Sequence, residues 1–209
     1  MKINTLLSGI LIVSLLASCG GNTSSEKDFV PLGRKQIDGT DTTYHTIADF
    51  EFVDQDSNTV TNETFEGKIY VADFFFTTCP TICPVMKTQM LRVYEAYKDD
   101  PEVGILSHTI DPAHDDVAVL HEFANNLGVN GDQWRFVTGE KEKIYEIAQK
   151  SYMVPASEDS TEPGGYIHSG AFILVDKDRH IMGVYDGTKP EAVDRLINDI
   201  ERLKKQQQS

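Results

Sequence analysis

The sequence predicts an α/β domain in which a mixed sheet is flanked by helices, and two observations predict it. Apolar segments typical of strands alternate along the chain with segments whose apolar residues recur at helical spacing. Near the C-terminal end, 171–175 and 181–185 enclose the turn 176–179, a pattern typical of an antiparallel hairpin. Such alternation gives a sheet sandwiched between helices, and 209 residues suffice for one domain with a buried core.

Each expected element follows from a local pattern. An early hairpin surrounds the turn signal at 54–58, where Asp, Ser and Asn cluster. The run 71–76 is rich in β-branched and aromatic residues, which favours a strand buried on both faces. The remaining expected strands are 103–110, 134–137, 171–175 and 181–185. The first expected helix begins at Pro84, and the other expected helices are 117–127, 141–153 and 193–203. An acidic loop rich in Pro and Gly is expected at 155–165.

The N-terminus has the pattern of an export signal. Lys2 is followed by a short apolar segment, 6–17, whereas about 20 apolar residues are needed to span a bilayer. The segment ends in the letters LASC, which resemble the lipobox of bacterial lipoproteins, where the cysteine is lipidated after cleavage. We therefore expect Cys19 to carry a lipid anchor; an ordinary signal peptide with a chance cysteine is the alternative.

Three parts of the chain are expected: a lipoprotein signal peptide at 1–18, a flexible tether at 19–43 and a folded domain at 44–209. The tether follows from a composition rich in Gly, Ser, Thr and charged residues. Such a protein would be exported and lipid-anchored to a bacterial membrane, with its domain on the periplasmic or extracytoplasmic side. The formal net charge of −14 argues against a nucleic-acid partner, because the phosphates would be repelled.

Cys79 and Cys83 are the only thiols of the expected domain, and they lie in the loop after the first long strand. Pro84 suits the first helical position, because its missing N–H would have no intrahelical partner there. The positive end of the helix dipole should lower the pKa of at least one thiol. Such a pair can form a disulfide or bind a soft metal. A purely structural disulfide is the weaker interpretation, because closing so short a loop removes little chain entropy.

A cysteine pair in the turn that leaves a buried strand is the arrangement of the thioredoxin class. We therefore expect a thioredoxin-like fold, with the hairpin around 54–58 as an N-terminal extension. Asp73 is an acid within the apolar strand, six residues before Cys79, the offset at which thioredoxins place a buried carboxylate. Burial would raise its pKa and let it exchange protons with a thiol. The alternative is an aspartate hydrogen-bonded to backbone at a strand edge.

Four segments together carry a more specific signal. They are, in order, 74–86 (FFFTTCPTICPVM), 109–115 (TIDPAHD), 136–139 (FVTG) and 166–169 (YIHS). Their combination resembles the Sco (SenC) family over roughly residues 44–203. The resemblance implies a domain that binds copper, as Cu(I) or Cu(II), through Cys79, Cys83 and His168. It also implies assembly of the dinuclear copper site of cytochrome c oxidase, with that enzyme's copper-bearing subunit, or another copper or thiol protein, as the partner.

The chemistry of these side chains agrees with copper. Thiolates are soft ligands suited to Cu(I), and imidazole accepts either oxidation state of the metal. Two thiolates and one neutral imidazole would give a three-coordinate site, whose open flank would let a ligand of the receiving protein enter. Zinc is the competing metal, but a closed structural zinc site usually has four protein ligands. The sequence offers no convincing fourth ligand.

Other candidate ligands have simpler explanations. His108 lies within an expected buried strand and is better explained as a hydrogen-bonded core residue, although it is the second choice for a histidine ligand. Met86 and Met90 stand at helical spacing, where methionine usually fills the core. The remaining four histidines have no partner pattern and are expected in solvent. The DPxxD segment is expected to shape and cap the turn into the next helix through Asp111, Pro112 and Asp115.

Two functions of different classes remain open. The first is a membrane-tethered copper metallochaperone that delivers copper to the dinuclear site or matures it. The second is an enzyme, a thiol–disulfide oxidoreductase that reduces the cysteines of a partner, with Cys79 and Cys83 as its redox pair. Reductases of the thioredoxin type usually have CxxC and a proline facing it. Here the spacing is CxxxC and no proline lies within 166–175, which favours the metallochaperone.

Overall fold

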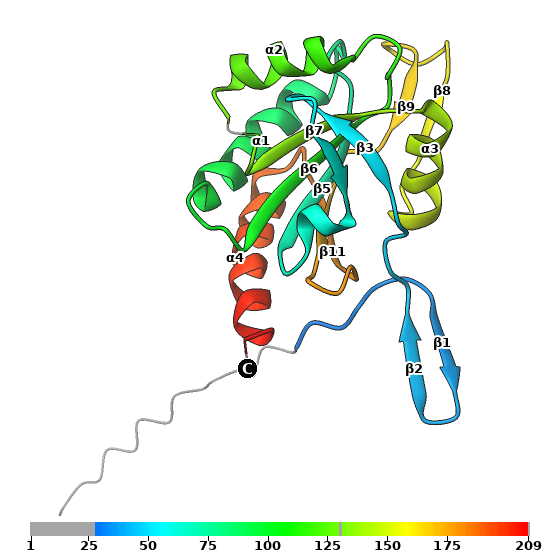
Figure 1. Ribbon diagram of the computed structural model, residues 1–209, viewed down its shortest axis with the longest axis vertical. Helices are drawn as coiled ribbons and strands as arrows, with labels where there is room; N and C mark the ends of the chain where they lie inside the picture. Colours follow the sequence, from blue (N-terminus) through cyan, green and yellow to red (C-terminus); the bar gives the residue numbers. More distant parts are fainter. Residues whose placement is uncertain (1–27, 130, 209) are drawn as a thin grey trace, which may run out of the picture.

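The computed structural model describes residues 28–129 and 131–208, which form a mixed seven-stranded sheet with helices on both faces (Figure 1). The strands of this sheet are β3 (Glu51–Asp54), β4 (Thr59–Thr61), β5 (Ile69–Phe75), β6 (Val103–Thr109), β7 (Trp134–Thr138), β10 (Ala171–Val175) and β11 (Ile181–Asp186). Their order across the sheet is β11-β10-β5-β6-β7-β3-β4. This is the α/β architecture that the alternating pattern predicts.

The helices and two smaller ribbons complete the described elements. The helices are η1 (Asn62–Phe65), α1 (Cys83–Tyr97), α2 (Val117–Leu127), α3 (Lys141–Glu146), the π-helical turn η2 (Ile147–Ser151) and α4 (Pro190–Gln206). The ribbons pair β1 (Lys35–Asp38) with β2 (Asp41–Tyr44), and β8 (Ala156–Glu158) with β9 (Tyr166–His168). No helix within 28–129 and 131–208 is both long and apolar enough to cross a bilayer.

β5 and β6 form the centre of the sheet, and every residue of both strands is buried. They run parallel, from Ile69 opposite Val103 to Phe75 opposite Thr109. Strands covered on both faces need apolar side chains on both sides, which explains the continuous apolar run in β5. Because parallel strands end at the same edge, the loops that follow β5 and β6 lie together, and such an edge is where α/β sheets usually bind ligands.

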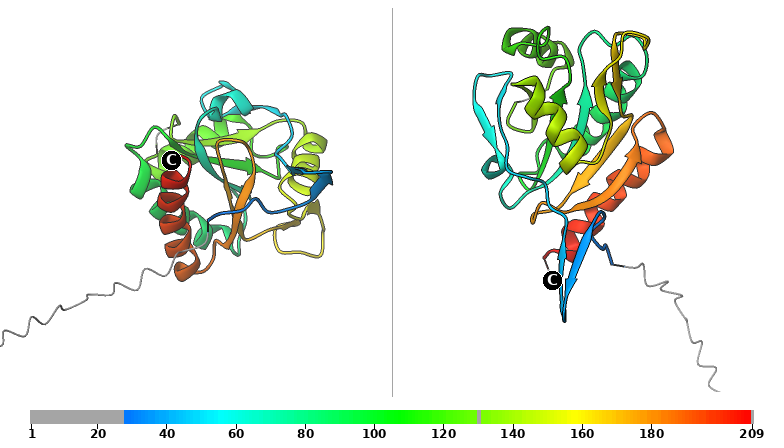
Figure 2. Two further views of the ribbon diagram at one scale, coloured as in Figure 1. Left: turned by 90° about the horizontal axis from the view of Figure 1, so that it is seen from below. Right: turned by 90° about the vertical axis from the view of Figure 1, so that its right-hand side faces the viewer.

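Different helices pack on the two faces of the sheet (Figure 2). Side chains alternate along a strand, so Asp73 and Ser107 share one face, whereas Phe74 and His108 share the other. The first face lies under α1 and α2, whose side chains line a small cavity with Asp73 and Ser107. The second lies under α3 and η2, and Tyr152 there packs against Phe74 and His108 at ring-centroid distances of 5.4 Å. α4 packs beside α1 and against β11.

The segment expected to be a flexible tether is partly ordered. Residues 35–44 form the β1–β2 ribbon, which extends from the body of the domain (Figure 1). Ahead of it, the Leu32 N–H donates to the Ile181 carbonyl at 2.7 Å, and the Phe29 N–H donates to Gln206 Oε1 at 2.8 Å. Within the expected tether, backbone groups of the described residues thus find partners in one another, on β11 and on α4. The expected signal peptide and the lipidation residue lie outside the described residues.

Two other expectations differ in detail. The helix predicted over 141–153 is α-helical only to Glu146 and then widens into the π-helical turn η2. The loop predicted over 155–165 begins with β8, whose backbone groups pair with β9. By contrast, the predicted stop of α2 is confirmed. Gly128 has a φ of +69°, in the left-handed region that glycine adopts without steric cost.

Candidate metal centre

The loop that carries both cysteines joins the end of β5 to the start of α1. The helix begins at Cys83 with Pro84 in its first turn, close to the predicted position, and no side chain caps it. Ahead of the loop, a tight turn is closed by the Cys79 N–H, which donates to the Phe76 carbonyl at 3.3 Å. The two cysteines are thus fixed between a fully buried strand and a helix.

The pKa values of the two thiols are shifted in opposite directions. Both cysteines are buried, and only 6% of Cys79 and 9% of Cys83 is exposed. Burial alone would raise the pKa of the Cys79 thiol, but hydrogen bonds from the backbone of Thr81 and Cys83 and from the Thr81 hydroxyl outweigh it and lower that pKa. At Cys83 burial dominates and raises the pKa, and the neighbouring Cys79 and Asp73 add to this rise. The lowered pKa expected for one thiol therefore falls on Cys79.

The segment 164–170, which contains His168, packs against the cysteine loop. A Cβ placed on Gly164 would lie 2.9 Å from Phe76 Cε2 and 3.1 Å from Pro80 Cδ. Beyond β9, a Cβ on Gly170 would lie 3.6 Å from Ile82 Cδ1. The backbone of His168 is thus held between two points that touch the cysteine loop, in β9 opposite β8. The His168 side chain lies outside the described part of the chain, so its role as a ligand stays a prediction.

Asp73 lies on the α1 side of the sheet and is 5% exposed. The Ser107 hydroxyl donates to Asp73 Oδ1, and Trp134 Nε1 donates in turn to Ser107 Oγ at 2.8 Å. Burial raises the pKa of Asp73 to about 7, and the Ser107 hydrogen bond opposes this only in part. Asp73 and Cys83 line a common cavity of about 20 Å³, the size of about one water molecule. Asp73 is therefore central in the sheet and bonded to a side chain, not to backbone at an edge.

A family model described as SCO1/SenC matches residues 38–205, most of the chain. The chain belongs to the SCO1/SenC family. The SCO1 protein homolog of Bacillus subtilis (strain 168) is 32% identical over 207 residues, which cover 96% of this chain and 97% of that protein. The resemblance found in the sequence motifs is thereby confirmed.

Solved SCO1/SenC structures share the fold. A SCO1/SenC family lipoprotein from Bacillus anthracis is 27% identical with a TM-score of 0.70, covering 77% of this chain and 95% of that one. BsSco, a Sco family cytochrome c oxidase assembly protein with a disulfide switch, is 32% identical with a TM-score of 0.67, covering 76% and 93%. Yeast Sco1 with copper bound is 26% identical with a TM-score of 0.57, covering 75% and 89%. The predicted thioredoxin-like α/β fold is confirmed, and copper is a metal that the family holds.

The remaining candidate ligands of this SCO1/SenC protein have other positions. His108 is fully buried, but neither ring nitrogen has a hydrogen-bond partner among the residues that the structure describes, so the expected hydrogen-bonded core residue is not found there. Its ring stacks on Phe74 at a centroid distance of 4.8 Å, on the face of the sheet away from Asp73. Met86 and Met90 fill the core as predicted. Of the four histidines expected in solvent, His114 and His121 are exposed as predicted, whereas His45 and His180 are half-buried. All four make hydrogen bonds.

The DPxxD segment shapes the turn into α2 as predicted, since the Asp115 N–H donates to the Asp111 carbonyl at 2.8 Å, but Asp115 does not cap the helix. The residue that caps α2 is Asp116, whose carboxylate accepts from the Val119 N–H at 2.9 Å. Asp115 is fully buried and instead accepts hydrogen bonds from Thr77 and Thr109. Sequence reasoning missed these two threonines, because threonine is common at strand ends and nothing in its spacing indicates a shared carboxylate.

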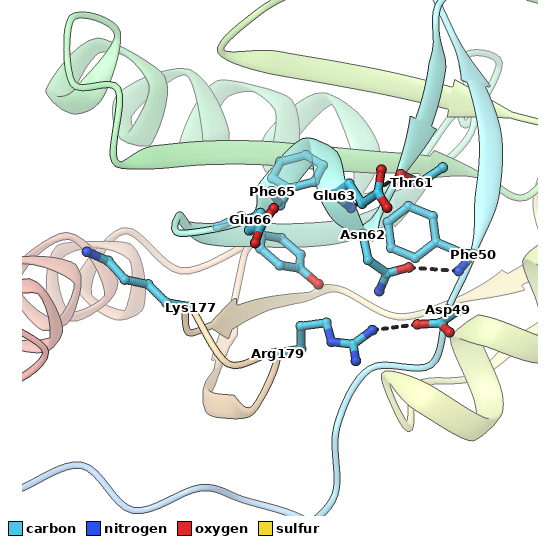
Figure 3. A pocket seen from close by; sticks show the side chains of 10 residues that line it. Asp49, Phe50, Thr61, Asn62, Glu63, Phe65, Glu66, Lys177 and Arg179 are labelled. Carbon is cyan, nitrogen blue, oxygen red and sulfur yellow. Dashed lines mark hydrogen bonds and ion pairs between the residues drawn. The ribbon is translucent and has the colours of Figure 1, made fainter.

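Other concave or acidic places in the structure lie away from the cysteines. A cavity of about 560 Å³ opens beside Tyr70, at the opposite end of β5 from the cysteine loop, and Figure 3 shows Arg179 in its wall, paired with Asp49. Within the described residues, a carboxylate and imidazole group close enough to share an ion occurs at 176–180. There Asp176 accepts backbone N–H groups of its own turn, which explains the cluster. The chemistry points to the cysteine loop.

Proposed function

We propose that this SCO1/SenC protein is a copper metallochaperone, and that Cys79, Cys83 and His168 hold the ion it delivers. The observation that carries the proposal is the contact between two segments: the β8–β9 ribbon touches the cysteine loop on both sides of His168. Two sulfurs and one imidazole would then converge at the carboxyl edge of β5. In keeping with the family, the acceptor would be the dinuclear copper site of cytochrome c oxidase.

The donor set suits Cu(I). Thiolates are soft ligands, and copper binding requires that both thiols lose their protons. Cys79 gives up its proton readily because its pKa is lowered, whereas the buried Cys83 releases its proton only when a cation compensates the charge. Three protein ligands leave one flank of the ion open. A ligand of the acceptor can bind there before the donor's own ligands leave, which is the geometry that transfer needs.

Asp73 is proposed as the group that receives the proton of Cys83. Its pKa of about 7 lets it accept and release protons near neutral pH. The shared cavity brings its carboxyl close to that sulfur. An Asp73→Asn variant should change the pH dependence of Cys83 alkylation while the protein stays folded. An alkylation profile that matches the unaltered protein would exclude this role.

Membrane attachment is proposed through a lipid on Cys19, with the domain outside the cytoplasm. The related Bacillus anthracis protein is described as a lipoprotein. The ordered N-terminal segment contacts Ile181 in β11, near the start of β5 in the sheet, whereas the cysteine loop follows the end of β5. The copper loop would then face away from the membrane. Mass spectrometry of the membrane fraction should find a diacylated N-terminal Cys19, and an unmodified residue 19 would refute it.

The second candidate function, thiol–disulfide exchange, is favoured by the unequal thiols. A nucleophilic Cys79 beside a protonated Cys83 is the asymmetry that disulfide reduction uses. BsSco, at 32% identity, is described as having a disulfide switch. Both functions need both cysteines, so His168 discriminates between them.

The test combines two assays on the reduced protein. Cu(I) titration against a chromophoric chelator should show one ion per chain, and His168→Ala should weaken binding by tenfold or more, which is about 1.4 kcal/mol or more. Reduction of a disulfide substrate should be nearly unchanged in the same variant. If copper affinity is indifferent to His168 and disulfide reduction is fast, the oxidoreductase is the better description.

A further inference from the structure

Asp115 is the most fully bonded carboxylate near the cysteine loop, and the function above does not use it. It is 0% exposed. Its Oδ2 accepts from the Thr77 N–H at 3.0 Å and from the Thr109 hydroxyl at 2.6 Å. Its Oδ1 accepts from the Thr77 hydroxyl and lies 2.9 Å from Nδ1 of His114. A carboxylate has about four acceptor positions, so this one is saturated.

The carboxylate joins three separate parts of the chain. Thr77 is the second residue after β5, Thr109 is the last residue of β6, and Asp115 stands just ahead of α2. The Asp115 N–H donates to the Asp111 carbonyl at 2.8 Å, which turns the DPxxD segment back toward the sheet edge. Hydrogen bonds to a carboxylate are stronger than those between neutral groups. Asp115 thus adds a side-chain link between the ends of β5 and β6, which also pair through their backbones.

Thr77 is the residue through which this network reaches the cysteines. It is the second residue of the turn that the Cys79 N–H closes on the Phe76 carbonyl. Both its N–H and its hydroxyl are held by Asp115, so neither its backbone nor its side chain can rotate freely. The position of Cys79 relative to Cys83 therefore depends on a carboxylate 36 residues further along the chain.

We propose that Asp115 and Thr77 act as positioning residues that hold Cys79 in the geometry required for metal binding. This inference deepens the proposed function and rests on it for copper. The network does not touch the ion. It acts by limiting the turn before Cys79 to one conformation, so that less ordering remains to be done when a metal binds.

Three variants separate positioning from general stability. Thr77→Val removes the hydroxyl that the turn offers to Asp115 and keeps the backbone N–H. Thr109→Val removes another hydroxyl that donates to the same carboxylate, at the end of β6 and outside the cysteine turn; that hydroxyl also accepts from the Asp111 N–H at 3.0 Å. Thr77→Ser keeps the hydroxyl and should restore the behaviour of the unaltered protein. Thermal unfolding measures the stability cost of each change.

Two readouts follow, one with metal and one without. Hydrogen exchange of the Cys79 amide should accelerate about tenfold in Thr77→Val and less than about twofold in Thr109→Val. The dissociation constant for Cu(I) should rise about fivefold to tenfold in Thr77→Val, with a rise below about twofold in Thr109→Val. Both quantities should return to their original values in Thr77→Ser.

Equal effects of the two valine variants would overturn the inference, because the carboxylate would then act on stability alone. Failure of Thr77→Ser to restore exchange would overturn it as well. The hydrogen-exchange measurement needs no copper. If the unaltered protein binds no Cu(I), the proposed function fails, and the Cys79 amide still decides whether Asp115 and Thr77 position the loop.

Discussion

At the scale of single residues, two buried titratable groups lie back to back in the centre of the sheet. Asp73 in β5 and His108 in β6 are one residue apart in the register of the two strands, and their side chains point to opposite faces of the sheet. Burial raises the pKa of Asp73 to about 7. Burial lowers the pKa of His108 to about 3, and the nearby Asp73 backbone opposes this fall. The native state therefore favours the neutral form of both groups.

These two groups should have opposite effects on stability as the pH changes. Between about pH 4 and 6.5, the folded protein holds one proton more than the unfolded chain at Asp73 and one fewer at His108. The two contributions cancel in that window. His108→Leu leaves only Asp73, so the free energy of unfolding should fall as the pH rises, by up to about 1.4 kcal/mol per pH unit.

Asp73→Asn leaves only His108 and reverses the sign. Its free energy of unfolding should rise with pH between about 3 and 6.5, because the unfolded histidine binds the extra proton there. Urea unfolding at a series of pH values measures both slopes. Parallel pH dependences in the two variants would show that these side chains are not buried neutral in the folded state.

The sequence predicted the residues whose spacing is distinctive and missed those whose role depends on register. The cysteine pair and the histidine motif are recognisable in one dimension, because their letters and order are specific. The link from Ser107 to Asp73 exists only because Ile69 pairs with Val103, and this register sets which residues of β5 and β6 stand opposite one another. Pattern alone fixes no register between distant parallel strands.

At the scale of elements, the β8–β9 ribbon packs against the cysteine loop, and under the proposed function it carries the histidine ligand, His168. Its closest approach is at Gly164, where a Cβ would be 2.9 Å from the Phe76 ring. A contact this short forces something to shift, so Gly164→Ala should push the ribbon away from the loop. We expect a Cu(I) dissociation constant at least about fivefold higher in this variant.

The neighbouring glycine offers a matched control. Gly165 has a φ of +86°, close to the +87° of Gly164, but a Cβ there meets nothing within 4 Å. Both substitutions carry the backbone cost of a left-handed alanine, roughly 1–2 kcal/mol. Only Gly164→Ala adds a steric clash with the Phe76 ring. Equal copper affinities for Gly164→Ala and Gly165→Ala would mean that this contact does not position the histidine.

Elements with weak local signals were the ones that sequence reasoning missed. β1, β2 and β8 are three or four residues long and mostly polar, so their composition matches a loop. They are strands because a partner strand satisfies their backbone groups, which only the folded chain supplies. The π-helical turn η2 differs from an α-helix by one residue in the spacing of its hydrogen bonds, and the periodicity of apolar residues is too coarse to detect that difference.

At the scale of the whole molecule, the ordered N-terminal segment and the cysteine loop occupy opposite ends of the central strand. β5 has seven residues, which at about 3.3 Å per residue separates the two ends by about 20 Å. The β1–β2 ribbon belongs to the end away from the cysteines (Figure 1). Its residues are exposed except for Tyr44, which is half-buried beside His180, so the ribbon adds little to the core.

Removing most of this ribbon should therefore leave the domain intact. The His45 N–H donates to the Arg34 carbonyl at 2.9 Å, so its two ends are already adjacent. Replacing residues 35–43 with two glycines should shift Tm by no more than about 2 °C and leave Cu(I) affinity unchanged. A large loss of Tm by calorimetry would show that the ribbon packs on the domain in solution.

The proposed copper site requires two sulfurs and one imidazole to meet at the edge of the sheet. X-ray absorption at the copper edge, on the reduced protein loaded with one equivalent of Cu(I), tests this most directly. We predict copper bound by two sulfur atoms and one nitrogen atom in the unaltered protein, with the nitrogen lost and both sulfurs retained in His168→Ala. Sulfur-only coordination that is identical in both proteins would contradict a copper site that includes His168.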